Sequence, residues 1–592
     1  GGRYRARRNG DPYGGVQVAS IRNDWGKAGE FLGDEILNTH VQARDIEGGI
    51  ITPFKKEVAA LSTADRYIAA DNLRAWVTGA KPIPTKFFPL VKETRAAFDA
   101  MGKKLIEAKV KVRENGVLRD LHMLGDTFFT NALDADWREA IQKESTPGHT
   151  GPTPLLDEWA ALNPSVDIAK ANPWTPKPTK TDSVLRTAYN AANELPRTFK
   201  YPDKAFVKDG IATVENHVAR SSARAAEEIH LPGGMEEGGK LKELVDAAEL
   251  QKPGSRAQLE DMVAHSLGRH PSGYVNNWSQ KLAQADAIYQ SVSKLAINPF
   301  NMAQQTSQMV NNAVVLGERH TFGGASKALA DFVTGESTER ARTSGVVRPD
   351  EYTSKAEVNQ GAAGATVAKI QKFTKWASAG SERLDRMGRL TTAEASPAML
   401  KDIQLDLQKG GRPAAKAERL MREIRMSEAD IAAVKAGTET PFQRTKFDMM
   451  LNGFVNIEGG AMHRPNWVNR LDQSYPGMGA IAYRFKNFPV QQMRLAKFAV
   501  TEFAHGNVKP IGRLVAYSIA HGEALAKLRE ALWGEDEDRR DWKDIIEDGD
   551  FGALAYRLGQ DMALSGTLGL PGSFIPPLAK PKSTVGEKVA AV

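Results

Sequence analysis

Residues 90–105 read LVKETRAAFDAMGKKL, and their apolar side chains return at intervals of three or four residues. Leu90, Phe98, Met101 and Leu105, with Thr94 among them, therefore lie along one face of an α-helix, since 3.6 residues make one turn. Patterns of the same period recur along most of the chain, whereas the two-residue alternation typical of β-strands is almost absent. We therefore predict an all-α fold, built as an extended assembly of helical segments without a substantial β-sheet.

One helix is delimited by short signals at both of its ends. Ser62 is followed by Asp65 three residues later and then by apolar residues, an arrangement that resembles a capping box. In a capping box the two side chains satisfy N–H groups that the first turn leaves free. Gly79 interrupts the same helical pattern. We expect one helix between these two signals.

Composition also divides the chain into helical regions and connections. Seven prolines between Pro147 and Pro178 exclude one continuous helix, and glycine, serine and threonine are frequent in residues 321–365. We expect six segments: 1–146, a helical region with a basic N-terminal arm; 147–185, a Pro-rich linker; 186–320, a central helical region; 321–365, a Gly/Ser-rich linker; 366–564, a helical region with a basic-aromatic helix and an acidic segment; and 565–592, a flexible tail.

Residue counts exclude several classes of site. The 592 residues contain no cysteine, so the chain has no disulfide, no thiolate metal site and no cysteine nucleophile. The formal net charge is +7, from 79 basic and 72 acidic residues. Residues 535–550 contain nine acidic and three basic residues, a net charge of −6, which leaves +13 for the rest. A mildly basic body suits contact with nucleic acid or an acidic membrane surface, and equally an ordinary soluble protein.

Motifs for catalysis, cofactor binding and metal binding are all incomplete. Residues 234–240 match the start of a phosphate-binding loop, but Leu241 stands where a magnesium-binding hydroxyl is required. The chain contains neither His-Glu-x-x-His nor a Gly-x-Ser-x-Gly elbow. Glu144-Ser145 and Glu336-Ser337 carry the dipeptide of lytic transglycosylases without the glycine-containing motifs that follow it in those enzymes. We expect a non-enzymatic protein with no cofactor and no metal site.

A basic and aromatic segment, residues 483–501, is the first candidate functional surface. It contains four basic residues, no acidic residue and several aromatic ones. Such groups together suit phosphate contact with base stacking, or anchoring at a membrane interface. The alternative is a helix with apolar core positions and a solvated basic edge. The candidate DNA-facing residues are Arg484, Lys486, Arg494 and Lys497, together with Arg3, Arg5, Arg7 and Arg8 of the N-terminal arm. The alternative for this arm is an unstructured start of the chain.

A stretch without charge, residues 295–317, is the second candidate. It is long enough to span a bilayer but contains too many amides and hydroxyls for a lipid-facing helix. Its apolar residues share a face opposite the amides. The amides either line a wet channel or a helix interface, or lie buried in a bundle or subunit contact. The candidate residues are Asn298, Asn301, Gln304, Gln305, Gln308, Asn311 and Asn312.

Two short motifs resemble those of a known group of proteins. Residues 294–305 read KLAINPFNMAQQ, and residues 483–490 read YRFKNFPV before an alanine- and methionine-containing helix. In these features the chain resembles the large internal virion proteins of short-tailed bacteriophages, where a Lys-Leu-x-x-Asn-Pro helix and a later Phe-x-x-Phe-Pro helix recur. The resemblance implies a structural protein that is ejected before the genome, assembles into a homo-oligomeric ring or tube and helps conduct DNA across the host cell envelope.

The same resemblance implies partners and locations. We expect contacts with other copies of this chain, with other phage ejection or portal proteins, with double-stranded DNA irrespective of sequence, and, as a further option, with the host inner membrane. The expected locations are the virion interior and, after ejection, the host periplasm and inner membrane. The alternatives are a virion-associated peptidoglycan-degrading enzyme that uses Glu144 or another buried carboxylate, and a helical scaffold without DNA contact.

Overall fold

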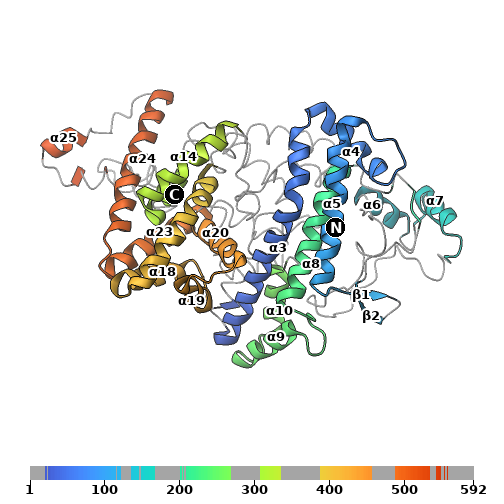
Figure 1. The fold of residues 1–592 in the computed structure, drawn as a ribbon, viewed down its shortest axis with the longest axis horizontal. Helices are drawn as coiled ribbons and strands as arrows, with labels where there is room; N and C mark the ends of the chain where they lie inside the picture. Colours follow the sequence, from blue (N-terminus) through green and yellow to red (C-terminus); the bar gives the residue numbers. More distant parts are fainter. Residues whose placement is uncertain are drawn as a thin grey trace. The chain divides into compact units, whose positions relative to one another are not determined.

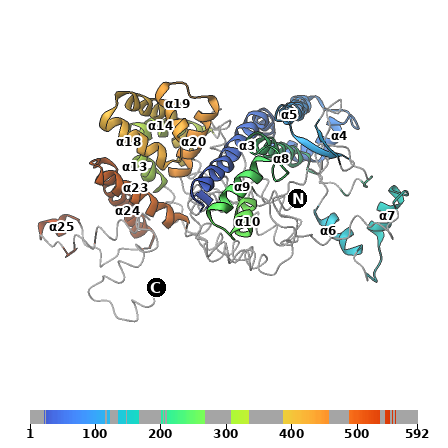
Figure 2. The ribbon, with the colours of Figure 1, turned by 90° about the horizontal axis from the view of Figure 1, so that it is seen from below.

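The computed structural model of the chain describes part of its 592 residues. The described residues are 21–22, 25–114, 117–121, 135–145, 149–166, 200–202, 205, 209–267, 307–334, 387–455, 487–533, 542–548, 552–553 and 557. They are predominantly helical (Figures 1 and 2), which confirms the all-α prediction.

The chain divides into two compact units. The first includes Ser20–Ser272, and the second includes Gly273–Val347 and Gln371–Val592. The division falls inside residues 186–320, which composition grouped into one helical region. Within this region, the described helices before the division pack with helices of the first unit, and those after it pack with helices of the second. The composition of residues 186–320 does not show this difference, because it carries no information on which helices pack together.

The first unit contains most of the described N-terminal half. Its elements are α3 (Gly26–Ala60), α4 (Thr63–Val77), the short 3₁₀ helix η1 (Thr85–Phe87), α5 (Phe88–Glu107), β1 (Lys111–Glu114), β2 (Val117–Asp120), α6 (Ala135–Glu144), α7 (Pro154–Leu162), α8 (Gly210–His230), α9 (Lys240–Gln251) and α10 (Arg256–Ser266). The two strands form an antiparallel hairpin in which Lys111 pairs with Asp120. This hairpin is the whole sheet structure of the described residues.

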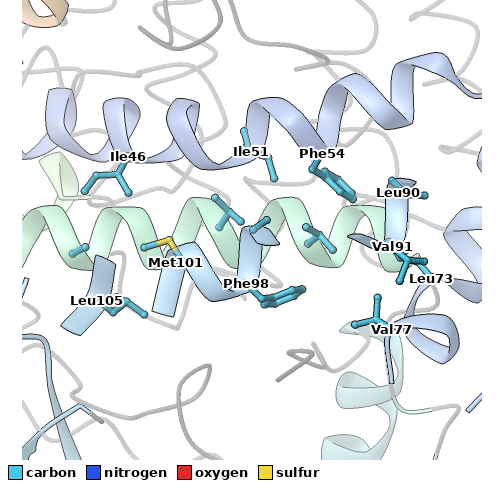
Figure 3. Close-up of a cluster of buried hydrophobic side chains, with 14 of the residues drawn as sticks. Ile46, Ile51, Phe54, Leu73, Val77, Leu90, Val91, Phe98, Met101 and Leu105 are labelled. Carbon is cyan, nitrogen blue, oxygen red and sulfur yellow. The ribbon is translucent and has the colours of Figure 1, made fainter. Parts of the chain in front are cut away.

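The core of the first unit lies between α3, α5 and α8. The predicted face of α5 is confirmed, because Leu90, Thr94, Phe98, Met101 and Leu105 are all buried. Figure 3 shows side chains of α3 and α5 directed toward α8 from two sides. The buried α8 residues in this core are Val214, Val218 and Ala225, and further buried positions of the helix hold alanine and serine.

The predicted helix after Ser62 is α4. The Ser62 Oγ accepts a hydrogen bond from the backbone N–H of Asp65 at 3.2 Å. Beyond the helix, Gly79 has a φ of 76°, a left-handed conformation that favours glycine and ends helical geometry. Both signals read from the sequence therefore delimit the helix as expected.

An ionic cluster joins three helices at one end of the first unit. Glu35 of α3 lies 2.6 Å from Nζ of Lys240, at the start of α9, and 3.3 Å from Nδ1 of His230, at the end of α8. Burial raises the pKa of the Glu35 carboxyl, but the hydrogen bonds from His230 and Lys240 outweigh that effect and lower the pKa to about 2. The ionised form of Glu35 therefore stabilises the folded state.

The second unit contains the remaining described helices. They are α13 (Ser307–Leu316), α14 (Glu318–Thr334), a helix over 387–409, α18 (Gly411–Glu423), α19 (Glu428–Ala436), α20 (Pro441–Val455), α23 (Asn487–Ala504), α24 (Lys509–Trp533) and α25 (Trp542–Glu547). The last ten residues of α20 are all buried. Two of these carry charge, and each has a polar partner: Lys446 lies 2.7 Å from Asp430, and Asp448 accepts a hydrogen bond from Ser396 at 2.6 Å.

Both predicted linkers contain a helix. Within 147–185, α7 starts at Pro154, because proline is well tolerated in the first turn of a helix, where its missing N–H is not needed. This helix buries Trp159. Within 321–365, residues 321–334 continue α14. The glycine at 324 belongs to a helix contact instead of a loop: a Cβ there would overlap the carbonyl oxygen of Thr391 and lie 3.1 Å from Cβ of Ala395. Close packing and loops both use glycine, so composition alone misassigned residues 321–334, whereas residues 335–365 lie outside the described residues and stay a prediction.

Within the described residues, no helix combines the length and the apolar character needed to cross a bilayer.

We predict that Glu35→Gln lowers the free energy of unfolding at pH 7 by about 1–2 kcal/mol, a value reduced for solvent screening of a half-buried group. Because the folded-state pKa lies below the ordinary value of 4.5, the stabilisation is complete above about pH 5 and is lost as the pH falls toward 2. Urea unfolding at several pH values measures the difference. Glu30→Gln, an exposed change on the same helix, is the control. A difference that persists at pH 2 would contradict the assignment.

We also predict opposite effects for two adjacent glycines of α14. Gly324→Ala destabilises the second unit by about 1–3 kcal/mol, because the added methyl group collides with backbone. Gly323→Ala stabilises it by about 0.5–1 kcal/mol, because open space surrounds that position and alanine favours helix. Thermal unfolding of both variants tests this pair, and equal shifts would show that 321–334 does not pack as described.

Candidate functional site

The two candidate segments meet in the second unit. Helix α13 belongs to the uncharged stretch and α23 to the basic and aromatic segment, and both pack against α24. Their common core is formed by Val310 and Val314 of α13, Ala499 of α23 and Leu514 of α24. The structure thus brings together helices from two candidate segments that lie more than 150 residues apart in the sequence. Residues 294–305, the first motif, lie outside the described residues.

The described amides of α13 point into the protein. Asn311 and Asn312 are both fully buried. The Asn312 side chain accepts a hydrogen bond from the hydroxyl of Thr392 at 2.9 Å and donates one to the carbonyl of Gly388 at 3.2 Å. Burial in a bundle is therefore confirmed for these two residues, and a channel-lining role for them is wrong. Hydrogen bonds to the neighbouring helix satisfy the Asn312 amide, which explains its place on an interior face.

The other candidate amides have no described side chains. Gln308 lies in α13, but its side chain is outside the described part. Asn298, Asn301, Gln304 and Gln305 also lie outside the described residues. Their role stays a prediction.

Arg494 does not face DNA, and that prediction is wrong. Its Nη2 donates a hydrogen bond to the carbonyl oxygen of Glu423, at the end of α18, over 3.3 Å. Its guanidinium lies 4.3 Å from the ring centroid of Phe454. Burial, and then the neighbouring positive charge of Arg425, lower the pKa of Arg494, although a guanidinium stays charged at neutral pH. Arg494 therefore fastens α23 to the end of α18, where the helix dipole favours a cation.

Lys497 is exposed on α23, as expected for a solvent-facing basic residue. Arg484 and Lys486 lie outside the described residues, as do Arg3, Arg5, Arg7 and Arg8. The DNA contact of these residues stays a prediction.

Ion pairs between helices hold the surface in place. Glu502, the acidic residue of α23, is almost fully buried and lies 2.8 Å from Nε of Arg419 on α18. Arg513 of α24 forms two hydrogen bonds to the carboxylate of Glu318 at the start of α14. Sequence reasoning missed both pairs. A single acidic residue in an otherwise basic helix was the signal that would have indicated Glu502 as an internal partner.

Where α23 turns into α24, the described surface is both basic and apolar. We call it the basic corner and define it by Lys416 of α18, Lys509 of α24 and the apolar residues Val500, Phe503 and Val508. The three apolar side chains are each more than half exposed. The pairing of Glu502 with Arg419 removes the nearest carboxylate from this surface.

Lys416 shows that positive charges gather at the basic corner. Although its side chain is largely exposed, the neighbouring helices partly desolvate its ammonium and lower its pKa. The charges of Glu502 and Asp406 oppose this shift, whereas those of Lys509 and Arg513 add to it. Three cations from two helices therefore lie close enough to affect one another.

Glu144, the carboxylate of the alternative enzyme, has a structural role. Its Oε2 accepts hydrogen bonds from the backbone N–H groups of Leu155 and Leu156 at 2.9 and 2.8 Å. These groups belong to the first turn of α7, so Glu144 caps that helix. The described residues contain no group of His, Asp and Glu side chains arranged to hold a metal.

No protein-family model, no curated protein and no solved structure matches this chain.

We predict that Arg494→Gln and Lys497→Gln separate stability from surface charge. Arg494→Gln lowers the stability of the second unit by about 1–3 kcal/mol, because it removes a partly buried charged hydrogen bond and the contact with Phe454. Lys497→Gln leaves stability unchanged, because that side chain is solvated. Urea unfolding followed by circular dichroism measures both. Similar midpoints for the two variants would place the Arg494 guanidinium in solvent and contradict its assignment.

Proposed function

We propose that this chain is a structural internal virion protein of a short-tailed bacteriophage. It assembles into a homo-oligomeric ring or tube and helps conduct the genome across the host cell envelope. The observation that carries the proposal is the packing of α13, which follows the first motif in the sequence, and α23, which contains the end of the second, around α24 in one core. That core presents a basic and apolar surface where α23 meets α24.

The construction of the chain suits ejection and reassembly. A protein without cysteine can unfold and refold in either redox environment without mispaired thiols. Helical units rich in local contacts refold faster than sheets that need distant pairing. The described fold is of this kind, with a single short hairpin as its sheet.

The proposed DNA contact is electrostatic and independent of base sequence. Lys497 offers an exposed charge on α23, and Arg484, Lys486 and the arginines at positions 3, 5, 7 and 8 are the further candidates. Arg494 is excluded from this set because it is bound inside the second unit. Other ejection or portal proteins and the host inner membrane are further proposed partners, and the virion interior and the host periplasm and inner membrane are the proposed locations.

The enzyme alternative gains no support from the structure. A glycosidase of the proposed kind needs a protonated carboxylic acid beside its substrate. Glu144 instead directs its carboxyl group at two backbone N–H groups of α7, which occupy its Oε2. We therefore propose no second function.

We predict that the purified full chain forms closed particles with a lumen wide enough for duplex DNA. We also predict that it binds DNA of unrelated sequences with an affinity that falls steeply as salt rises, because phosphate contacts release counterions. Electron microscopy of the particles and DNA binding at several salt concentrations measure these two properties. A chain that stays monomeric at every concentration, or DNA affinity that is independent of salt, would contradict the proposal.

A further inference from the structure

Helix α24 separates two surfaces of opposite charge. At its N-terminal end lies the basic corner, which includes Lys509, the first residue of α24. Beyond its C-terminal end lies α25, inside the acidic segment 535–550 with its net charge of −6. Asp544, Glu547 and Asp548, in and directly after α25, are exposed. The two surfaces are complementary in charge, and the chain holds them at opposite ends of one helix.

Chain length disfavours a contact between these surfaces within one copy. Helix α24 has 25 residues and is about 37 Å long at about 1.5 Å per residue. From Trp533, its last residue, to Trp542, the first residue of α25, there are nine residue steps. Even fully extended, nine steps reach only about 30–32 Å. Helix α25 itself adds about 8 Å from Trp542 to Glu547, so its acidic residues reach the start of α24 in the same copy only when the whole connection is stretched along α24.

Apolar side chains also lie at the basic corner, and they limit which partner segment can bind there. Val500, Phe503 and Val508 are each more than half exposed and adjoin lysines. A partner segment that is acidic alone would leave these side chains in water, whereas the sequence of α25, WKDIIE, combines acidic and apolar residues. One of these apolar residues, Ile545, is buried within its own copy, whereas the acidic residues Asp544 and Glu547 are exposed. A second copy supplies this helix at equal concentration.

We propose that the basic corner of one copy binds α25 of the next copy, head to tail. This inference rests on the proposed self-assembly and names the surfaces that carry it. A contact between two different surfaces repeats from copy to copy, so it closes into a ring when the rotation between copies permits. Lys416 and Lys509 pair with Asp544 and Glu547 of the neighbour, and the apolar residues of the corner are covered in the same contact.

The experiment uses two charge-reversed full-length variants. The first, Lys416→Glu with Lys509→Glu, makes the corner acidic, and the second, Asp544→Lys with Glu547→Lys, makes α25 basic. Each alone places like charges in the contact, so we expect association, measured by sedimentation velocity, to weaken at least tenfold. An equimolar mixture of the two places opposite charges in every contact, and we expect association to return to within threefold of the unmodified chain. This recovery also shows that both variants are folded.

A matched control reverses two exposed lysines elsewhere in the second unit. Lys327→Glu with Lys435→Glu changes the net charge by the same amount as the first variant but leaves the basic corner intact. We expect its association to equal that of the unmodified chain. Association weakened as much by this control as by the first variant would show an effect of total charge and would overturn the assigned contact.

Further outcomes separate this inference from the proposed function. An unmodified chain that stays monomeric would overturn the self-assembly itself. An unmodified chain that assembles, with variants that assemble equally well, would leave the proposed function standing and overturn the contact. If association recovered when all four changes were made in one chain but not in the mixture of the two variants, the contact would lie inside one copy. That result would overturn the proposed contact between copies. If the first variant assembled normally but lost its binding to DNA or to anionic vesicles, the basic corner would be assigned to those partners. That result would also overturn the proposed contact between copies.

Discussion

Close approach between helices is the constraint on which both units depend. Helices with charge on much of their surface pack through the faces that are apolar or that carry small side chains, because only there can neighbouring side chains interdigitate densely. In the first unit, Val214, Val218 and Ala225 of α8 pack with the longer side chains of α3 and α5. In the second, Gly324 lets α14 meet the helix over 387–409. Polar groups drawn into these contacts acquire partners, as Lys446 does with Asp430 and Asn312 does with Thr392.

Periodicity predicted those parts of the fold in which one helix face is apolar and the rest is charged. The stripe of α5 and the ends of α4 belong to this class, because local sequence alone determines them. The extent of α14 does not. Glycine permits both a loop and a close helix contact, and only the neighbouring backbone of Thr391 decides between the two.

The candidate site shows the same limit. Lys497 and Arg494 lie on one helix and three residues apart, yet one is solvated and the other is bound to the end of α18. Nothing in the composition of α23 distinguishes them, because the difference depends on Phe454 and Glu423, which reach the site through folding. The amides of α13 are a second case: their spacing predicts a polar face, and the facing residue Thr392 makes that face internal.

The missing Cβ of Gly324 has a mechanical consequence for the second unit. Sliding α14 along its neighbour by one helical turn would bring His320 or Ala328 opposite the carbonyl of Thr391, and either residue has the Cβ for which that position has no room. Only one axial register of α14 is therefore compatible with close contact. The close contact at Gly324 therefore resists sliding of α14 along its neighbour. A force applied along α14 meets resistance from overlap with the backbone before any side-chain packing is disturbed.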